Sequence, residues 1–195
     1  MDADIRVSSL PSENRKLFQM VKNQTLSKMI RFSWWESHEA MVQCGITEGD
    51  VFSLTAGPVL MYFHSGLVIG AASDPAQNSV LIWVERNDTD YVSDDPIETD
   101  TDLFSINALD KQYSSSYWRQ IVGHRIEEIS IIKSIPQNAL LAELANEVGV
   151  EFVMDNGNKF IMSHGLHNSS DDFSVITESC IDRRLLENLR WVNVL

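Results

Sequence analysis

The stretch "EFVMDNGNKFIMSHGLHN", residues 151–168, decides the fold. Apolar residues lie on both sides of Asn156-Gly157, a dipeptide that suits the tight two-residue turn of a β-hairpin. That turn would pair Phe152 with Ile161, and it would leave apolar side chains on both faces of the hairpin. Because a strand pair with two apolar faces is usually covered on both sides, the sequence predicts an inner pair rather than an exposed edge.

Strand patterns continue on both sides of the hairpin. Residues 50–73, 78–86 and 124–135 are rich in aromatic and β-branched side chains, and turn residues interrupt the first of these ranges. This composition is typical of strands joined by short turns. Together with the hairpin, these strands predict a mostly antiparallel, curved sheet built from hairpins.

Helices are expected before, between and after these strands. Ser33 and Glu36 have the spacing of a capping box and predict the start of an N-terminal helix that ends at a glycine. A short helix is expected over residues 114–123. Near the other end, Ser179 would begin an amphipathic helix that runs to about Arg190. The predicted class is therefore α+β, with N-terminal helices and a C-terminal amphipathic helix packed on the sheet.

The length of the chain fits one domain, because domains cluster at roughly 100–200 residues. We expect a single domain over residues 1–195, divided into a helical N-terminal part, 1–45, and a sheet-rich part, 46–195. Strong helix formers predict a further helix over residues 137–149. The most unusual segment is a long acidic loop at residues 85–102.

The charge balance narrows the choice of partners. The formal net charge is -13, and the isoelectric point is about 4.6. This charge repels nucleic acid and anionic membranes, so neither is an expected partner, whereas a basic protein is favoured. Solubility alone would also explain an acidic surface. The N-terminal sequence lacks the apolar run of a secretory signal, and no stretch reaches the ~18 apolar residues of a membrane helix, so a cytoplasmic location is expected.

Residues 85–102, "ERNDTDYVSDDPIETDTD", hold eight acidic residues and one arginine, a net charge of -7 and more than half of the total. With so few apolar residues the segment is expected to be a solvated loop. It lacks the glycine and the ligand spacing of a calcium loop. A second interpretation is a docking surface for a basic protein, because clustered carboxylates raise the rate of association.

Two histidines give the chain its most metal-like pattern. His164 and His167 follow the predicted hairpin, and Asp171 could complete a set of three ligands. However, helical zinc motifs space their histidines four residues apart, whereas here the spacing is three and Gly165 interrupts it. A polar loop is the preferred interpretation. The alternative is a metal-binding protein or a hydrolase-type enzyme that uses these three residues.

Neither the cysteines nor the aromatic residues predict a catalytic site. Cys44 and Cys180 form no C-x-x-C pair and are expected to be free thiols, with a single disulfide as the alternative. Cys180 is the better nucleophile candidate because it would begin a helix, but no base lies near it in sequence. His38 is expected to be a core histidine, and Trp34 and Trp35 core or interface anchors. No phosphate-binding or nucleophile-elbow motif occurs, so we expect no catalytic residue and no cofactor.

The C-terminal two-fifths of the chain resembles bacterial immunity proteins, which protect a cell from its own polymorphic toxins. The resemblance lies in the strand "GHRIEEISIIK", residues 123–133, in "GVEFVMDNGNKFIMSHGL", residues 149–166, and in the short amphipathic segment that follows. It implies a small, acidic, non-catalytic protein that binds a cognate toxin one-to-one and blocks its active site.

If the resemblance holds, the acidic loop is the natural contact. Many toxins act on nucleic acid through basic clefts, and carboxylates can occupy such a cleft in place of phosphates. The expected partner-binding residues are Asp88, Asp90, Asp94, Asp95, Glu98, Asp100 and Asp102.

Overall fold

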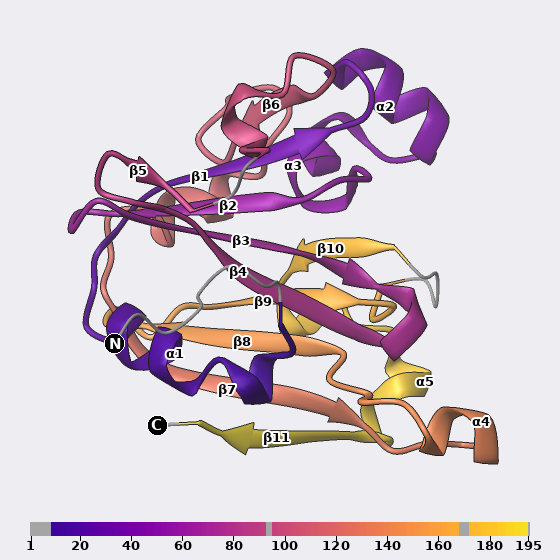
Figure 1. The fold of residues 1–195 in the computed structure, drawn as a ribbon. Coiled ribbons are helices and arrows are strands. Elements are labelled where there is room, and N and C mark those ends of the chain that lie inside the picture. Colours follow the sequence, from indigo (N-terminus) through magenta and orange to yellow (C-terminus); the bar gives the residue numbers. More distant parts are fainter. Residues whose placement is uncertain (1–8, 93–94, 168–171, 195) are drawn as a thin grey trace.

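The computed structural model describes residues 9–92, 95–167 and 172–194. Within these ranges the strands form two antiparallel sheets that face each other, and short helices lie around them (Figure 1). The first sheet comes from the first part of the chain and the second from the remainder. The predicted α+β class with a curved antiparallel sheet is confirmed, and the strands are shared between two sheets.

The first sheet contains β1 (Leu26–Ser33), β2 (Val59–Phe63), β3 (Leu67–Asp74), β4 (Ser79–Asn87), β5 (Asp90–Tyr91) and β6 (Phe104–Asn107). Their order is β5-β4-β3-β2-β1-β6. The prediction that residues 1–45 are helical was wrong for β1. Both faces of β1 are covered, so its buried residues run without a break from Met29 to Ser33, and the alternation that marks a strand is absent.

The second sheet contains β7 (Ile126–Ser134), β8 (Gly149–Met154), β9 (Lys159–His164), β10 (Phe173–Ile176) and β11 (Leu189–Asn193). Their order is β10-β9-β8-β7-β11. The hairpin strands β8 and β9 lie between β7 and β10, so the predicted inner position is confirmed. The last strand, β11, returns to pair with β7.

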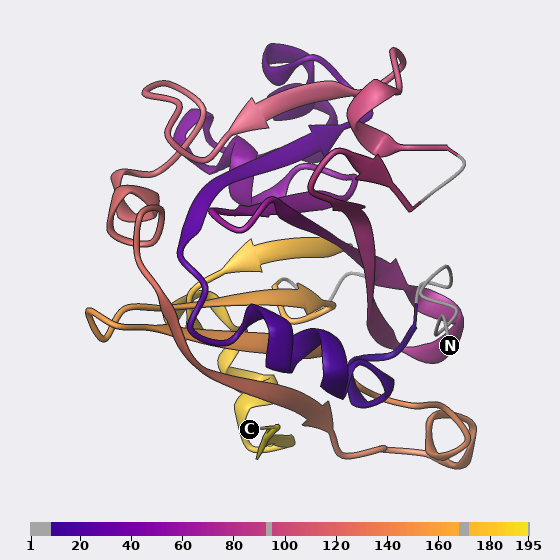
Figure 2. The same cartoon turned by 60° about the vertical axis from the view of Figure 1, so that its left-hand side comes forward.

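Five α-helices lie in the described residues: α1 (Arg15–Val21), α2 (Ser37–Cys44), α3 (Val51–Leu54), α4 (Ala139–Ala142) and α5 (Arg183–Leu186). Helix α1 lies across one open side between the two sheets (Figure 2) and buries Leu17, Phe18 and Val21 there. No helix in the described ranges is long and apolar enough to cross a membrane.

The predicted capping box of α2 was wrong. Ser33 is the last residue of β1, and its buried hydroxyl shares a hydrogen bond of 2.7 Å with the Thr55 hydroxyl. The helix therefore begins later, at Ser37. His38 is exposed, so it is not the core residue that was predicted. Trp34 is also exposed and therefore lies outside the core, which leaves its predicted interface role untested, whereas Trp35 packs partly against the core.

Two other predicted helices are much shorter in the structure. The helix expected over residues 137–149 is reduced to α4, and Gly149 begins β8. The C-terminal helix is reduced to α5, because Leu189 and the following residues pair with β7. Its cap is Asp182 rather than Ser179, since the Asp182 carboxylate accepts a hydrogen bond from the Arg184 amide at 3.0 Å.

The hairpin loop has three residues, so the predicted register was wrong by one position. Phe152 pairs with Phe160 rather than Ile161, and the two rings stack with centroids 4.9 Å apart. The cause is the side chain of Asn156. It accepts a hydrogen bond from the Asn158 amide at 3.0 Å, and it donates one to the Gln120 carbonyl at 2.7 Å.

The main core lies between the sheets and includes side chains from both. Phe52 of α3 and Phe160 of β9 pack there against Trp118, which belongs to a short 3-10 helix, η5 (Ser116–Gln120). Phe18 of α1 belongs to the same core. Each such side chain stabilises the fold by about 1.5–3 kcal/mol when fully buried. The core thus fixes η5 and α3 against the end of the second sheet.

Candidate functional site

The acidic segment, residues 85–102, is built into the first sheet at its beginning. Its first carboxylate, Glu85, belongs to β4 and is completely buried. Glu85 accepts hydrogen bonds from the Trp83 indole at 2.7 Å and from the Ile97 amide at 2.5 Å. The prediction of a loop starting at residue 85 was therefore wrong, because residues 85–87 belong to β4. The hydrogen bond from the Ile97 amide also connects Glu85 to a later part of the segment.

A second anchor is the ion pair between Arg86, the one arginine of the segment, and Glu98. The Arg86 guanidinium donates to the Glu98 carboxylate at 3.0 Å and also to the Asp88 carbonyl. Burial, together with the neighbouring Glu98 carboxylate, raises the pKa of Tyr62 on β2. Glu98 thus lies beside both Arg86 of β4 and Tyr62 of β2, and it is the most enclosed of the described carboxylates predicted to bind a partner.

Apolar contacts complete the attachment. Ile97, in the 3-10 helix η4 (Ile97–Thr99), and Leu103, just after the segment, pack on the outer face of the first sheet. There they meet a cluster that includes Phe32 and Leu60. The segment therefore has apolar contacts that its composition did not predict, and it follows a defined path over the sheet.

The remaining described carboxylates of the segment point to solvent. They are Asp88, Asp90, Asp95, Asp100 and Asp102, whereas Asp94 lies outside the described residues. Within the described part of the chain, no ion pair involves Asp88, Asp90, Asp100 or Asp102. The result is a group of exposed negative charges on a support that is fixed by two buried or half-buried anchors.

The two histidines of the predicted metal site have different surroundings. His164, at the end of β9, is buried, and its Nδ1 lies 3.1 Å from the Ser73 hydroxyl of the first sheet. His167 lies at the surface, with Nδ1 3.2 Å from the Cys180 carbonyl. Asp171 lies outside the described residues. Among the residues that are described, no three His, Cys, Asp or Glu side chains are placed to hold a metal.

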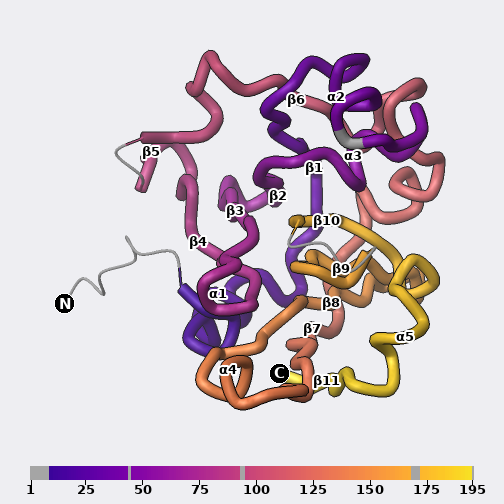
Figure 3. Tube along the Cα trace, turned by 90° about the vertical axis from the view of Figure 1, so that its right-hand side faces the viewer, coloured from indigo at the N-terminus to yellow at the C-terminus, as the bar shows by residue number. Residues whose placement is uncertain are grey.

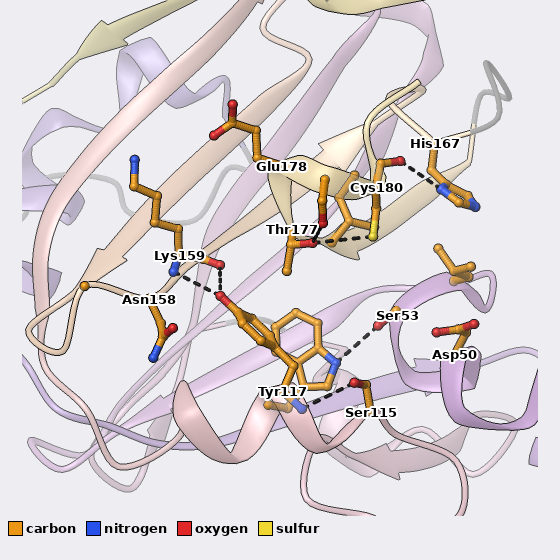
Figure 4. A pocket seen from close by; sticks show the side chains of 15 residues that line it. Asp50, Ser53, Ser115, Tyr117, Asn158, Lys159, His167, Thr177, Glu178 and Cys180 are labelled. Atoms are coloured by element: carbon orange, nitrogen blue, oxygen red, sulfur yellow. Dashed lines mark hydrogen bonds between the residues drawn. The ribbon is translucent and has the colours of Figure 1, made fainter. Parts of the chain in front are cut away.

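The structure brings His167 and Cys180 together at a pocket of about 550 Å³ (Figure 4). We call it the α3–η6 pocket, because it lies between α3 and a 3-10 helix, η6 (Glu178–Cys180). The Cys180 thiol is free and exposed, and its Sγ lies 3.4 Å from the Thr177 hydroxyl. Because the imidazole N–H donates to the Cys180 carbonyl rather than facing Sγ, this geometry is not that of a cysteine–histidine nucleophile pair.

Sequence reasoning missed most of this pocket. Asp50, at the start of α3, and Tyr117 and Trp118, in η5, come from segments far from Cys180 in the chain. The Trp118 indole donates to the Ser53 hydroxyl at 3.2 Å, which fixes η5 against α3. The sequence signal over residues 114–123 predicted a short helix and gave no reason to place it beside η6.

A buried carboxylate lies next to the pocket on the outer face of the second sheet. Glu151 of β8 is 4% exposed, and its Oε2 has no hydrogen-bond partner among the described residues. The Lys159 ammonium, on β9, lies 3.7 Å from Oε1. Burial raises the pKa of Glu151, the Glu178 carboxylate adds to this effect, and Lys159 and the nearby Trp191 side chain oppose it.

Replacing Glu151 by glutamine is expected to make the protein at least as stable as the wild type at neutral pH. A raised folded-state pKa means that the stability from this group is complete below the ordinary glutamate pKa and is lost as the pH rises through the raised value. The advantage of Glu151→Gln in the free energy of unfolding should therefore shrink on acidification. Urea unfolding over a pH series measures it, with the exposed Glu128→Gln on β7 as the control. An advantage that grew towards low pH would contradict the assignment.

Two features are thus candidate sites: the acidic segment on the first sheet and the α3–η6 pocket beside the second. They share none of their residues. Comparisons of the chain with protein-family models, with curated proteins and with solved structures found no match.

Proposed function

We propose that this protein is a non-catalytic inhibitor that binds a basic partner protein through its acidic segment. The proposed partner is a cognate bacterial toxin, and the proposed role is that of a cytoplasmic immunity protein. The observation that carries the proposal is the group of exposed carboxylates held on a folded support by the anchors of Glu85 and Glu98. The resemblance of the C-terminal two-fifths of the sequence to immunity proteins supports the same class.

The anchors matter for affinity. A disordered acidic tail must lose conformational freedom when it binds, and this cost lowers the affinity. In the acidic segment, the Glu85 hydrogen bonds and the Glu98–Arg86 pair already hold the backbone that carries the charges. Exposed charges of one sign also speed the approach of an oppositely charged protein. The segment therefore suits a basic cleft, where its carboxylates would stand in place of phosphates.

Neutralising the exposed charges is expected to weaken partner binding strongly. The variant Asp88→Asn/Asp90→Asn/Asp100→Asn/Asp102→Asn keeps the size of each side chain and leaves both anchors intact. We expect its affinity for the partner to fall at least about 100-fold at low salt, with a shallower dependence on salt. The matched control removes as many exposed carboxylates elsewhere, at Glu39, Glu128, Glu143 and Glu187, and should bind nearly as the wild type does.

The partner is obtained by co-purification from the native host, and binding is then measured with both purified proteins. The proposal expects a basic protein in a one-to-one complex, whose own activity falls to zero at equimolar inhibitor. Equal affinity and equal salt dependence in the acidic-segment variant would refute the docking surface. If a substoichiometric amount of this protein chemically modified or degraded the whole of the partner, the non-catalytic role would be refuted.

A further inference from the structure

The α3–η6 pocket has the size and walls of a ligand site. Its volume of about 550 Å³ falls within the range of small-molecule pockets, roughly 300–1,000 Å³. Leu54, Trp118 and Ile176 give it an apolar floor. Tyr117 forms a fixed wall, because its hydroxyl donates to the Lys159 carbonyl at 2.6 Å and accepts from the Lys159 amide at 3.1 Å.

The charged side chains around this floor are mainly negative. Asp50 comes from the α3 side, where its Oδ2 also accepts a hydrogen bond from the Thr47 hydroxyl at 2.5 Å, and the exposed Glu178 comes from the η6 side, at the rim of the pocket (Figure 4). The ammonium of Lys159 is drawn towards Glu151, outside the lining, at 3.7 Å. The His167 N–H is directed at the Cys180 carbonyl. The pocket therefore offers carboxylates and an aromatic wall to a ligand, and little positive charge.

We infer that the α3–η6 pocket binds an ammonium or guanidinium group carried on an apolar stem. The stem would lie on Leu54, Trp118 and Ile176, and the cation would pair with Asp50 or Glu178. Aromatic faces attract such cations, and carboxylates bind them through charge-assisted hydrogen bonds. The same chemistry occurs in the arginine or lysine side chain of another protein and in a free organic amine.

This site is separate from the docking surface proposed above. Strand β5 of the acidic segment and helix α3 of the pocket lie on different sides of the molecule (Figure 3). This protein could therefore bind its partner through the acidic segment while the α3–η6 pocket is empty. The two proposals are tested independently.

The test is titration of the full chain, labelled with nitrogen-15, followed by amide chemical shifts. N-acetyl-arginine amide represents a protein side chain, 1,4-diaminobutane a free amine, and N-acetyl-citrulline amide the neutral control. We expect the cationic compounds to bind with a dissociation constant of about 1 mM, as small ligands of this size do. The shifts should be confined to the amides of the lining segments around Ser53, Tyr117, Asn158 and Ser179.

Removing the carboxylates is expected to abolish the preference for cations. Asp50→Asn/Glu178→Gln should weaken binding of the arginine amide at least about tenfold. Each single variant should weaken it less, so the test survives if the double variant does not fold. The control Glu143→Gln/Glu187→Gln carries the same charge change outside both the pocket and the acidic segment and should bind normally.

The titrations distinguish the two natural sources of the cation. Binding of the arginine amide without the diamine would support a protein side chain as the natural ligand, and binding of the diamine would support a free amine. Equal binding of the neutral citrulline compound, unchanged affinity in the carboxylate variants, or no shift in the lining segments would overturn the inference.

Discussion

Replacing Arg31 by alanine is expected to lower the free energy of unfolding by about 3 kcal/mol or more, because two buried carbonyl groups lose a charged donor, at about 1.5–3 kcal/mol each. Arg31 lies on β1 and is completely buried. Its guanidinium donates to the Thr55 carbonyl at 3.1 Å and to the Phe173 carbonyl of β10 at 2.6 Å. It also lies over the Phe173 ring, 4.6 Å from the centroid. Arg31 therefore joins the two sheets, and its loss leaves buried carbonyl groups without these donors.

Urea unfolding measures this effect through the shift in the midpoint. Lys28→Ala, on the same strand but exposed, should change the stability by no more than about 0.5 kcal/mol. Arg31→Lys should recover only part of the loss, because one ammonium cannot reproduce the planar fork of donors. If Arg31→Ala unfolded at the same urea concentration as Lys28→Ala, Arg31 would not hold the sheets together.

Replacing Gly57 by alanine is expected to destabilise the fold by roughly 3 kcal/mol or more, since a steric clash adds to a strained backbone. Gly57 has φ +125° and precedes β2. A Cβ atom there would lie 1.9 Å from the carbonyl oxygen of Phe32, a backbone atom of β1 that has little room to move. The substitution would push β1 and β2 apart at their paired ends.

Gly45→Ala separates the clash from the strain. Gly45 also has a positive φ, +63°, but nothing lies within 4 Å of its missing Cβ. Only the backbone term remains there, about 1–2 kcal/mol. The thermal midpoint of the Gly57 variant should therefore fall well below that of the Gly45 variant. Similar midpoints for the two variants would mean that β1 yields to the new methyl group.

The sequence predicted strands best where one period dominated. Val59–Phe63 and Ile126–Ser134 lie within predicted strand ranges, and Ser79–Asn87 extends one residue beyond its predicted range. β1 was missed because its two covered faces erase the alternation. The register of the hairpin was missed because Asn156 bonds to Gln120, a residue that no local pattern connects to the turn. Contacts between residues far apart in the sequence thus determined the hairpin register, which hydrophobic periodicity alone did not specify.

The candidate sites divide in a similar way. The acidic segment was visible because charge density is a property of the sequence itself. Its anchors were not, since neither the burial of Glu85 nor the packing of Ile97 follows from composition. The α3–η6 pocket could not be predicted from the sequence, because Asp50, Trp118 and Glu178 come to line one pocket only when both sheets are in place.

The pairing of β11 with β7 has a consequence for how the protein is made. The ribosome synthesises residues 135–188 after β7 and before β11, so the outer edge of β7 stays unpaired during that time. An open strand edge can pair with the same edge of another unfinished chain. The second sheet is thus completed only after Leu189–Asn193 have been made, and protection against association between nascent chains depends on how soon these residues can reach that edge.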